Sequence, residues 1–188
     1  MTHIDKANTI DDASGISYQV LTTLRDIEAI SAEWDLVLDQ SCCNRAFSCS
    51  KWFLASATID HHVSPYVIVA RRGSQIAGIL PLSIANDGQT LTFAGEMSDY
   101  NDMIANDSDR DVLAGLLSSA LRFGKRYRRI VLNRVRPDCH EPTGAENDFR
   151  PALGFPTAGL DIPLRRPWKR IVRFHRWWRT LDRTERRQ

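Results

Sequence analysis

The sequence predicts an α/β protein in which a mixed, mainly antiparallel sheet is flanked by helices. Three observations support this prediction. Short apolar runs indicate strands, segments with apolar residues three and four positions apart indicate amphipathic helices, and three of the strand-like runs follow one another directly, as in an antiparallel meander. The predicted order is β-α-α-β-β-β-α-β, and such interleaving is typical of one sheet covered by helices.

The first third of the chain is expected to supply one strand and two helices. Residues 1–15 are polar and acidic and are predicted to be a disordered leader. Apolar and polar residues alternate over 16–24, which predicts a half-buried strand. Helices are predicted over 26–39, with Asp26 at the N-cap, and over 50–59.

The middle of the chain is expected to form the meander. Gly73 and Gly88 each lie in a short polar segment between two apolar runs, which is typical of hairpin turns. Pro81 inside the second run predicts a bulge or an edge position, because proline cannot donate to a sheet ladder. Gly78 in the same run would allow either a bulge or the close approach of a ligand. The three runs are 65–71, 75–85 and 90–94.

A third helix and a last strand complete the predicted domain. Apolar residues recur at helical spacing over 109–124, and Gly124 suits the helix C-terminus. Residues 129–133 are apolar enough for a strand inside the sheet, and 136–159 are rich in Pro, Gly and charge and are predicted to be a loop. The side chains expected in the core are Trp34, Trp52, Val67, Val69, Ile79, Leu82, Phe93, Leu116, Leu117, Val131 and Leu132.

The composition is that of a globular protein with one main domain. The 188 residues are 43% hydrophobic and 26% charged, so disorder of the whole chain is excluded, and the expected domain covers 16–164. The longest apolar stretches are of strand length, well short of the ~20 residues that a membrane-spanning helix needs. The first 14 residues lack the apolar core of a secretory signal, which predicts a cytoplasmic protein.

Charge is distributed unevenly along the chain. Residues 165–188 hold ten Lys and Arg against two acidic residues, whereas 1–164 hold 15 basic and 21 acidic residues. Three interpretations of this basic, tryptophan-rich tail stay open: it binds nucleic acid, it contacts an anionic membrane surface, or it is an out-of-frame end of the chain. Few contacts between the tail and the domain are expected.

No metal site is predicted from the cysteines. Cys42, Cys43, Cys49 and Cys139 contain no CxxC pair, and the adjacent Cys42 and Cys43 cannot easily share one tetrahedral metal. Reduced thiols in a cytoplasmic protein are the simpler interpretation.

Several short motifs resemble those of a known family. They occur in one order along the chain: Trp34-Asp35, Phe47 to Phe53 (FSCSKWF), Pro65 to Arg71 (PYVIVAR), Ile76 to Leu82 (IAGILPL), and Phe93-Ala94-Gly95 followed by Ser98 to Asp102 (SDYND). Together they resemble the acetyltransferase-type domain of the CelD-like cellulose and exopolysaccharide biosynthesis proteins, relatives of the FemAB peptidyltransferases. The element order resembles the first half of the GNAT acyltransferase fold. The resemblance covers residues 18 to about 160.

The resemblance implies an acyltransferase. It would move an acyl group from acetyl-CoA or another acyl-CoA to an amine or hydroxyl of an envelope or exopolysaccharide precursor, without a metal. Family members resemble two GNAT-like halves in tandem, with the acyl-CoA chemistry mainly in the second. The chain would then correspond to the first half, and a second GNAT-like half is an implied partner.

One departure from the GNAT pattern leaves an alternative open. A GNAT domain binds the pyrophosphate of CoA with a glycine-containing loop that opens a helix, whereas residues 101–111 contain no glycine and several carboxylates, which would repel a pyrophosphate. The alternatives are therefore a non-catalytic recognition half of a split or truncated transferase, or a peripheral membrane-binding protein acting through its tail.

The SDYND motif is the candidate site. It lies between a predicted strand and a predicted helix, where α/β folds often bind ligands. Asp99 or Asp102 could act as general base for an amine or hydroxyl nucleophile, and Tyr100 as general acid or orienting group. The alternative is a solvated, helix-capping turn. For Trp34 and Trp52, packing in the core is favoured over a role in a sugar- or lipid-binding surface.

Overall fold

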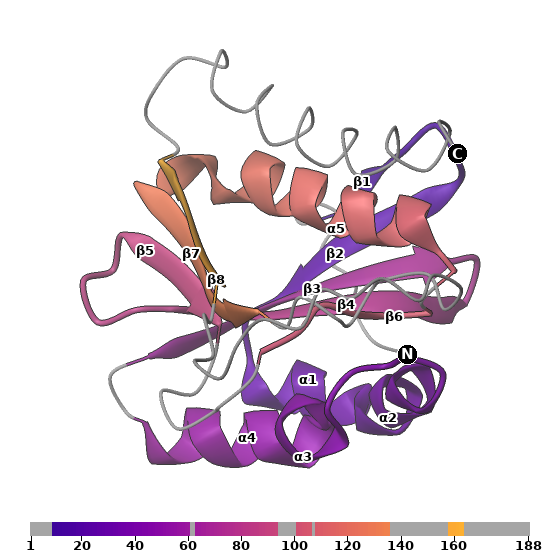
Figure 1. Cartoon of the computed structure of the whole chain (residues 1–188), viewed down its shortest axis with the longest axis horizontal. Helices are drawn as coiled ribbons and strands as arrows, with labels where there is room; N and C mark the ends of the chain where they lie inside the picture. The colour runs from indigo at the N-terminus through magenta and orange to yellow at the C-terminus, as the bar shows by residue number, and fades with distance from the viewer. Residues whose placement is uncertain (1–8, 61–62, 94–100, 107, 136–157, 164–188) are drawn as a thin grey trace, which may run out of the picture.

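The computed structural model describes residues 9–60, 63–93, 101–106, 108–135 and 158–163. These residues form three layers, with helix α5 on one face of a sheet and helices α1 to α4 on the other (Figure 1). The elements are β1 (Thr9–Asp11), β2 (Ile16–Leu21), α1 (Leu24–Ala29), α2 (Ser31–Asp39), α3 (Arg45–Ser48), α4 (Ser50–Ile59), β3 (Ser64–Arg72), β4 (Gln75–Ile84), β5 (Thr90–Phe93), β6 (Ile104–Ala105), α5 (Arg110–Phe123), the short 3-10 helix η2 (Gly124–Arg126), β7 (Arg129–Val135) and β8 (Ala158–Pro163).

The sheet is mixed and mainly antiparallel, as predicted. Its strand order is β1-β2-β3-β4-β5-β7-β8, and β6 pairs separately with β4. Among the described strands the parallel pair is β5 and β7, with Thr90 opposite Arg129 and Thr92 opposite Val131. Because parallel neighbours need a crossover, α5 connects these two strands across one face of the sheet. The predicted fold class, a mainly antiparallel α/β sheet flanked by helices, is confirmed.

Alternation along the strands produces two apolar cores. Ile68 and Leu80 belong to the core that α5 covers, whereas Val67 and Ile79, their neighbours in the strands, belong to the core covered by α1, α2 and α4. All four side chains are fully buried. Burying a side chain of this size stabilises a fold by roughly 1.5–3 kcal/mol, so the two cores together hold the three layers in place.

Most of the predicted core is observed. Trp52, Leu117 and Val131 are only partly buried. Leu117 packs at the margin of the α5 core, and Trp52 lies at the edge of a pocket described below. The other eight predicted residues are buried: Trp34, Val67, Val69, Ile79, Leu82, Phe93, Leu116 and Leu132.

Several predicted boundaries were wrong. Residues 9–11 were predicted to belong to a disordered leader, but Thr9–Asp11 forms β1 and pairs with β2; residues 1–8 of that predicted leader lie outside the described residues. The helix predicted over 26–39 is two helices that meet at Ile30, and α1 begins earlier, after Thr23. Thr23 is the N-cap in place of Asp26: the backbone N–H of Asp26 donates to Thr23 Oγ1 (3.1 Å), and the Thr23 hydroxyl donates to the Asp26 carboxylate (2.6 Å).

Two further elements lie where the sequence analysis predicted neither a helix nor a strand. The short helix α3 lies between the two predicted helices, and β8 begins at Ala158, inside the predicted loop over 136–159. The apolar pattern of the sequence could not predict α3, because its four residues form no apolar stripe. The helix begins instead at Asn44, whose side chain caps its N-terminus.

Pro81 lies where the pairing partner of β4 changes. On one side β4 pairs with β3 along its length, but on the other side β6 pairs with Gly78 and Ile79, and β5 pairs with Leu82 to Ile84. A residue without a backbone N–H suits this gap in the ladder. The bulge predicted near Pro81 occurs at Ala77, which has no partner in β3.

Gly78 serves helix packing in this structure. A Cβ atom added there would lie 2.5 Å from Val112 Cγ1 and 3.1 Å from Leu116 Cδ1, both on α5. The glycine therefore lets α5 approach β4 closely, and the alternative that it admits a ligand is not supported.

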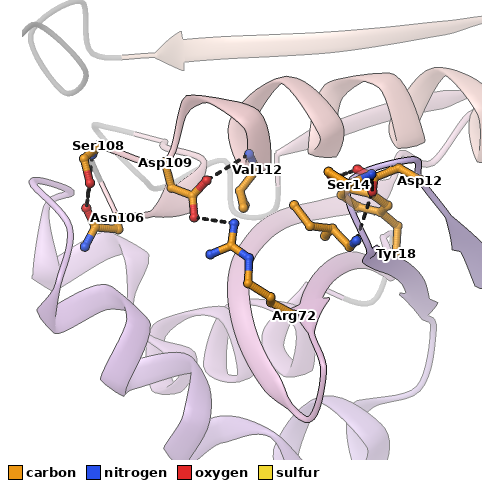
Figure 2. Close-up of polar contacts among 9 residues, drawn as sticks. Asp12, Ser14, Tyr18, Arg72, Asn106, Ser108, Asp109 and Val112 are labelled. Atoms are coloured by element: carbon orange, nitrogen blue, oxygen red, sulfur yellow. Dashed lines mark hydrogen bonds and ion pairs between the residues drawn. The ribbon is translucent and has the colours of Figure 1, made fainter.

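The turn between β1 and β2 is organised by Asp12 (Figure 2). Its carboxylate accepts hydrogen bonds from the backbone N–H and hydroxyl of Ser14, from the backbone N–H of Ile16 and from the Tyr18 hydroxyl, at 2.7–3.0 Å. Burial raises the pKa of Asp12, but these hydrogen bonds outweigh it and hold the pKa below its usual 3.8. Burial and the Asp12 carboxylate raise the pKa of Tyr18.

Acid is expected to weaken this turn. Since the pKa of Asp12 is lower in the folded chain than in the unfolded chain, its contribution to stability is complete above about pH 4 and is lost as the pH falls through the folded-state pKa. The Asp12→Asn variant should lose stability at neutral pH and show a smaller further loss on acidification, measured by urea denaturation between pH 2.5 and 7. Asp11→Asn, at the exposed end of β1, is the matched control. An unchanged acid dependence in Asp12→Asn would contradict the prediction.

Candidate functional site

A small pocket opens between the helical layer and the gap in the sheet at Pro81. Its volume is about 10 Å³, which is room for about one water-sized group. The lining residues come from α2, α3, α4, β4 and the segment before β6: Trp34, Phe47, Ser48, Trp52, Phe53, Pro81, Asn101 and Asp102.

The lining divides into a buried floor and a partly exposed rim. Phe47, Trp52 and Pro81 are partly exposed and form the rim. The floor is buried and combines rings with polar groups: Trp34, Ser48, Phe53, Asn101 and Asp102. Buried polar groups and partly exposed apolar side chains thus line the same pocket.

Two side chains of α2 hold the floor in place. The Trp34 indole donates from Nε1 to the backbone carbonyl of Ser48 at 2.8 Å. The carboxylate of Asp35 accepts from both the backbone N–H and the hydroxyl of Ser50, each at 3.0 Å. Asp35 therefore caps the N-terminus of α4 from another helix, so that the Trp34-Asp35 motif fixes the segment around Ser48.

Aromatic pairs stiffen the same region. Trp34 and Phe53 pack with ring centroids 5.4 Å apart, and Phe47 meets Trp52 edge to face at 5.1 Å. Contacts of this kind add about 0.5–1.5 kcal/mol each beyond the burial of area. Trp34 is a core anchor, as favoured by its spacing, while Trp52 combines partial packing with a position on the pocket rim.

One of the three predicted site residues lies in the described part of the chain. Asp99 and Tyr100 lie outside the described residues. Asp102 lines the pocket, but it is only 2% exposed and both of its carboxylate oxygens are shielded from solvent. The burial arises because the chain turns directly into β6, which pairs with β4 beneath the helices.

The structure adds Ser48 and Asn101 to the candidate site. Both are buried, at 4% and 7% exposure, and both line the pocket beside Asp102. The Ser48 hydroxyl has no hydrogen-bond partner within the described residues. Ser48 belongs to the FSCSKWF motif and Asn101 to the SDYND motif, and this is the sequence signal that could have identified them. The motifs alone do not show that their two segments meet in the folded chain.

The N-terminus of α5 is already occupied by side chains (Figure 2). Asp109 Oδ1 accepts from the backbone N–H of Val112 at 3.4 Å, and Asp109 Oδ2 forms an ion pair with Arg72 at 2.9 Å. A carboxylate that caps this helix end leaves a poor site for another anion. This helix end therefore does not fit the pyrophosphate of CoA, in agreement with the missing glycines.

Within the described ranges, His, Cys, Asp and Glu do not gather in groups of three or more that could hold a metal ion. Cys42, Cys43 and Cys49 form no disulfide with one another, and Cys43 donates from Sγ to the carbonyl of Met103 at 3.3 Å. No helix in the described part of the chain is long and apolar enough to span a membrane.

Comparisons with known proteins find similarity to solved structures only at a distance. No protein-family profile matches the sequence, and no curated protein matches it at a significant level. A solved structure with a similar arrangement is that of a probable GNAT-family acetyltransferase from Chromobacterium violaceum. The match has 14% sequence identity and a TM-score of 0.41, and it covers 69% of this chain and 74% of the other.

Proposed function

We propose that this chain is an acyltransferase-family protein of GNAT/FemAB type that transfers an acyl group from an acyl-CoA to an amine or hydroxyl of an envelope or exopolysaccharide precursor. One observation carries the proposal. Four of the motifs that resemble the CelD-like proteins are far apart in sequence, yet each contributes to the lining of one pocket. The four contributions are Trp34, the Phe47 to Phe53 segment, Pro81, and Asn101 with Asp102.

In this proposal the pocket holds the acceptor. Acylation of an amine or a hydroxyl releases a proton, and Asp102, which lines the pocket, is the proposed base that takes it up. Asp99 is the alternative base, and Tyr100 is the proposed acid or orienting group; both follow from the motif. The donor is acetyl-CoA or another acyl-CoA, and the work is proposed to take place in the cytoplasm.

A second candidate function follows from the capped N-terminus of α5. If the Asp109 cap and its ion pair with Arg72 exclude the donor, the domain acts as a non-catalytic recognition module. It would bind the acceptor and deliver it to a partner that carries the CoA site, such as a second GNAT-like domain.

Calorimetry and an activity assay separate these two functions. The enzyme requires saturable binding of acetyl-CoA to the full chain, through contacts other than the capped N-terminus of α5, and transfer of a radiolabelled acetyl group to amine acceptors. Asp102→Asn should bind acetyl-CoA with unchanged affinity but transfer acetyl about 10²- to 10⁴-fold more slowly, which is the usual contribution of a general base. Absence of acetyl-CoA binding at millimolar concentration would reject the enzyme and support the recognition module.

A further inference from the structure

A basic surface lies where α5 ends and β7 begins. Residues 122–129 hold five basic side chains and no acidic one, and all five are exposed. Arg129 donates from Nε to Thr90 Oγ1 at 3.1 Å and is already engaged. The other four define a basic patch: Arg122, Lys125, Arg126 and Arg128.

The charges of the basic patch are not neutralised by the protein itself. None of the four side chains forms an ion pair within the described residues. Arg128 donates to the amide oxygen of Gln89 at 3.4 Å, and the Arg126 guanidinium lies 4.9 Å from the centroid of the Tyr127 ring, so both partners are neutral. The Asp87 carboxylate in the β4–β5 turn accepts its hydrogen bonds from within that turn. Because like charges repel, an anionic partner would stabilise this surface.

The usual role of basic residues at a helix end explains only part of the patch. Cations near a helix C-terminus interact favourably with the helix dipole, which accounts for Arg122 in α5 and for Lys125 and Arg126 in η2. Arg128 follows η2 and directly precedes β7, outside the last helical turn. The dipole effect fades beyond that turn, so it does not account for Arg128.

The register of the sheet brings a second basic segment to the same place. Pro163, the last residue of β8, pairs with Arg129, the first residue of β7, and Figure 1 shows the two strands together at one edge of the sheet. Residues 165–188 follow directly from this point in the sequence and hold ten Lys and Arg against two acidic residues. The basic patch therefore lies where the most basic part of the sequence leaves the sheet.

Two observations favour a membrane over a nucleic acid as the partner. Arg126 lies over the rings of Tyr66 and Tyr127, which are only 2% and 4% exposed and so cannot stack on bases as the aromatic residues of single-strand-binding proteins do. A basic sequence with apolar residues at helical spacing and with tryptophan is typical of segments that lie on anionic bilayers. Residues 165–188 show this pattern among their arginines at Ile171, Phe174, Trp178 and Leu181.

We propose that the basic patch docks the protein on an anionic lipid surface. Its four exposed side chains lie against the headgroup phosphates, and residues 165–188 add to the attraction from the end of β8. None of the residues that line the pocket takes part. The inference is therefore independent of the proposed acyl transfer, and either can fail without the other.

Flotation of the full chain with lipid vesicles measures this docking. We expect saturable binding to phosphatidylcholine vesicles that contain about 30% phosphatidylglycerol, at least tenfold weaker binding to pure phosphatidylcholine, and a steep loss of binding as NaCl is raised from about 50 to 500 mM. Equal binding to the two kinds of vesicle would overturn the proposal. Displacement from the anionic vesicles by duplex DNA at an equal concentration of charge would also overturn it, in favour of a nucleic acid.

Variants of the basic patch locate the docking surface. Each Lys or Arg near an anionic bilayer raises the partition coefficient about fivefold, so the combined Lys125→Gln, Arg126→Gln and Arg128→Gln variant should bind about 100-fold more weakly. If the loss of Arg126 disturbs the packing of Tyr127, the double variant Lys125→Gln/Arg128→Gln still decides, with an expected loss of about 25-fold. Native binding in the double variant would show that residues 165–188 act alone and would overturn the proposal.

The matched control removes the same number of charges from other surfaces. It combines Arg25→Gln, Arg45→Gln and Arg110→Gln, all at exposed positions, in α1, in α3 and at the opposite end of α5. Its binding should stay within about threefold of the native chain, because charges farther than a Debye length from the bilayer are screened. Equal losses in the control and in the triple variant of the patch would show that net charge alone drives binding, and the proposed surface would be rejected.

Discussion

Replacing Trp34 with alanine is expected to lower the free energy of unfolding by about 3–5 kcal/mol, as for other fully buried aromatic residues. The side chain is 0% exposed and packs against Phe53. Its loss would leave a cavity beneath α2 and α4 and would also remove the hydrogen bond from Nε1 to the carbonyl of Ser48. Urea denaturation followed by circular dichroism measures the effect.

Trp52→Ala is the matched comparison, because Trp52 is a second tryptophan of the same helical layer. It is only partly buried, on the pocket rim, so its removal should cost under about 2 kcal/mol, within the usual range for single substitutions. Trp34→Phe, which keeps a large ring but loses the indole N–H, should fall between the two. An equal loss in the two alanine variants would show that Trp52 is as much a core anchor as Trp34, and the pocket would then lack an open rim.

The parts of the fold that depend on local patterning were predictable. The strand over 16–24 alternates because one face of β2 is buried, and the helix over 109–124 shows an apolar stripe because α5 covers the sheet. The Gly73 turn was also predictable, since its φ of +63° is a conformation that glycine adopts without strain.

The parts that depend on contacts between distant segments could not be predicted. Ile30 continues the apolar stripe of 26–39 without interruption, so the break between α1 and α2 carries no local signal. The burial of Asp102 depends on β6, a strand of two residues that forms only by pairing with Gly78 and Ile79. A five-residue motif of polar and acidic side chains indicates solvent exposure when it is taken alone, and the helices that line the pocket with Asp102 lie more than 40 residues away from it in sequence.

The pocket also forms between segments that are distant in sequence, so the sequence identified its motifs but not their meeting. The SDYND and FSCSKWF motifs were identified separately, but their meeting requires residues 101–103, just before β6, to lie against residues 43–53. The hydrogen bond from Cys43 Sγ to the carbonyl of Met103 is one contact that holds these segments together. The motifs in the sequence therefore indicated a candidate site. Which of their residues line one pocket could be seen only in the structure.

The second large effect is expected at Gly115 on the sheet-facing side of α5. A Cβ atom at this position would overlap the hydroxyl of Tyr18 and lie 2.5 Å from its Cζ atom. Tyr18 cannot easily move aside, because it is 1% exposed and its hydroxyl donates to Asp12. Gly115→Ala should therefore lower the free energy of unfolding by about 1–3 kcal/mol, the usual cost of overpacking, even though alanine favours a helix by about 1 kcal/mol over glycine.

A double-mutant cycle tests whether the Tyr18 hydroxyl is the cause. Tyr18→Phe removes the overlapping atom, so Gly115→Ala should cost less in the Tyr18→Phe background than in the native chain, with a coupling of about 0.5–3 kcal/mol. Recovery should be partial, because the remaining ring carbon is still too close to the added Cβ. Ser118→Ala, at an exposed position of the same helix, is the control and should change stability by no more than about 0.5 kcal/mol. Full additivity of the two substitutions would show that α5 shifts away from the sheet as a unit, and the close approach of α5 to β2 would then not depend on glycine at this position.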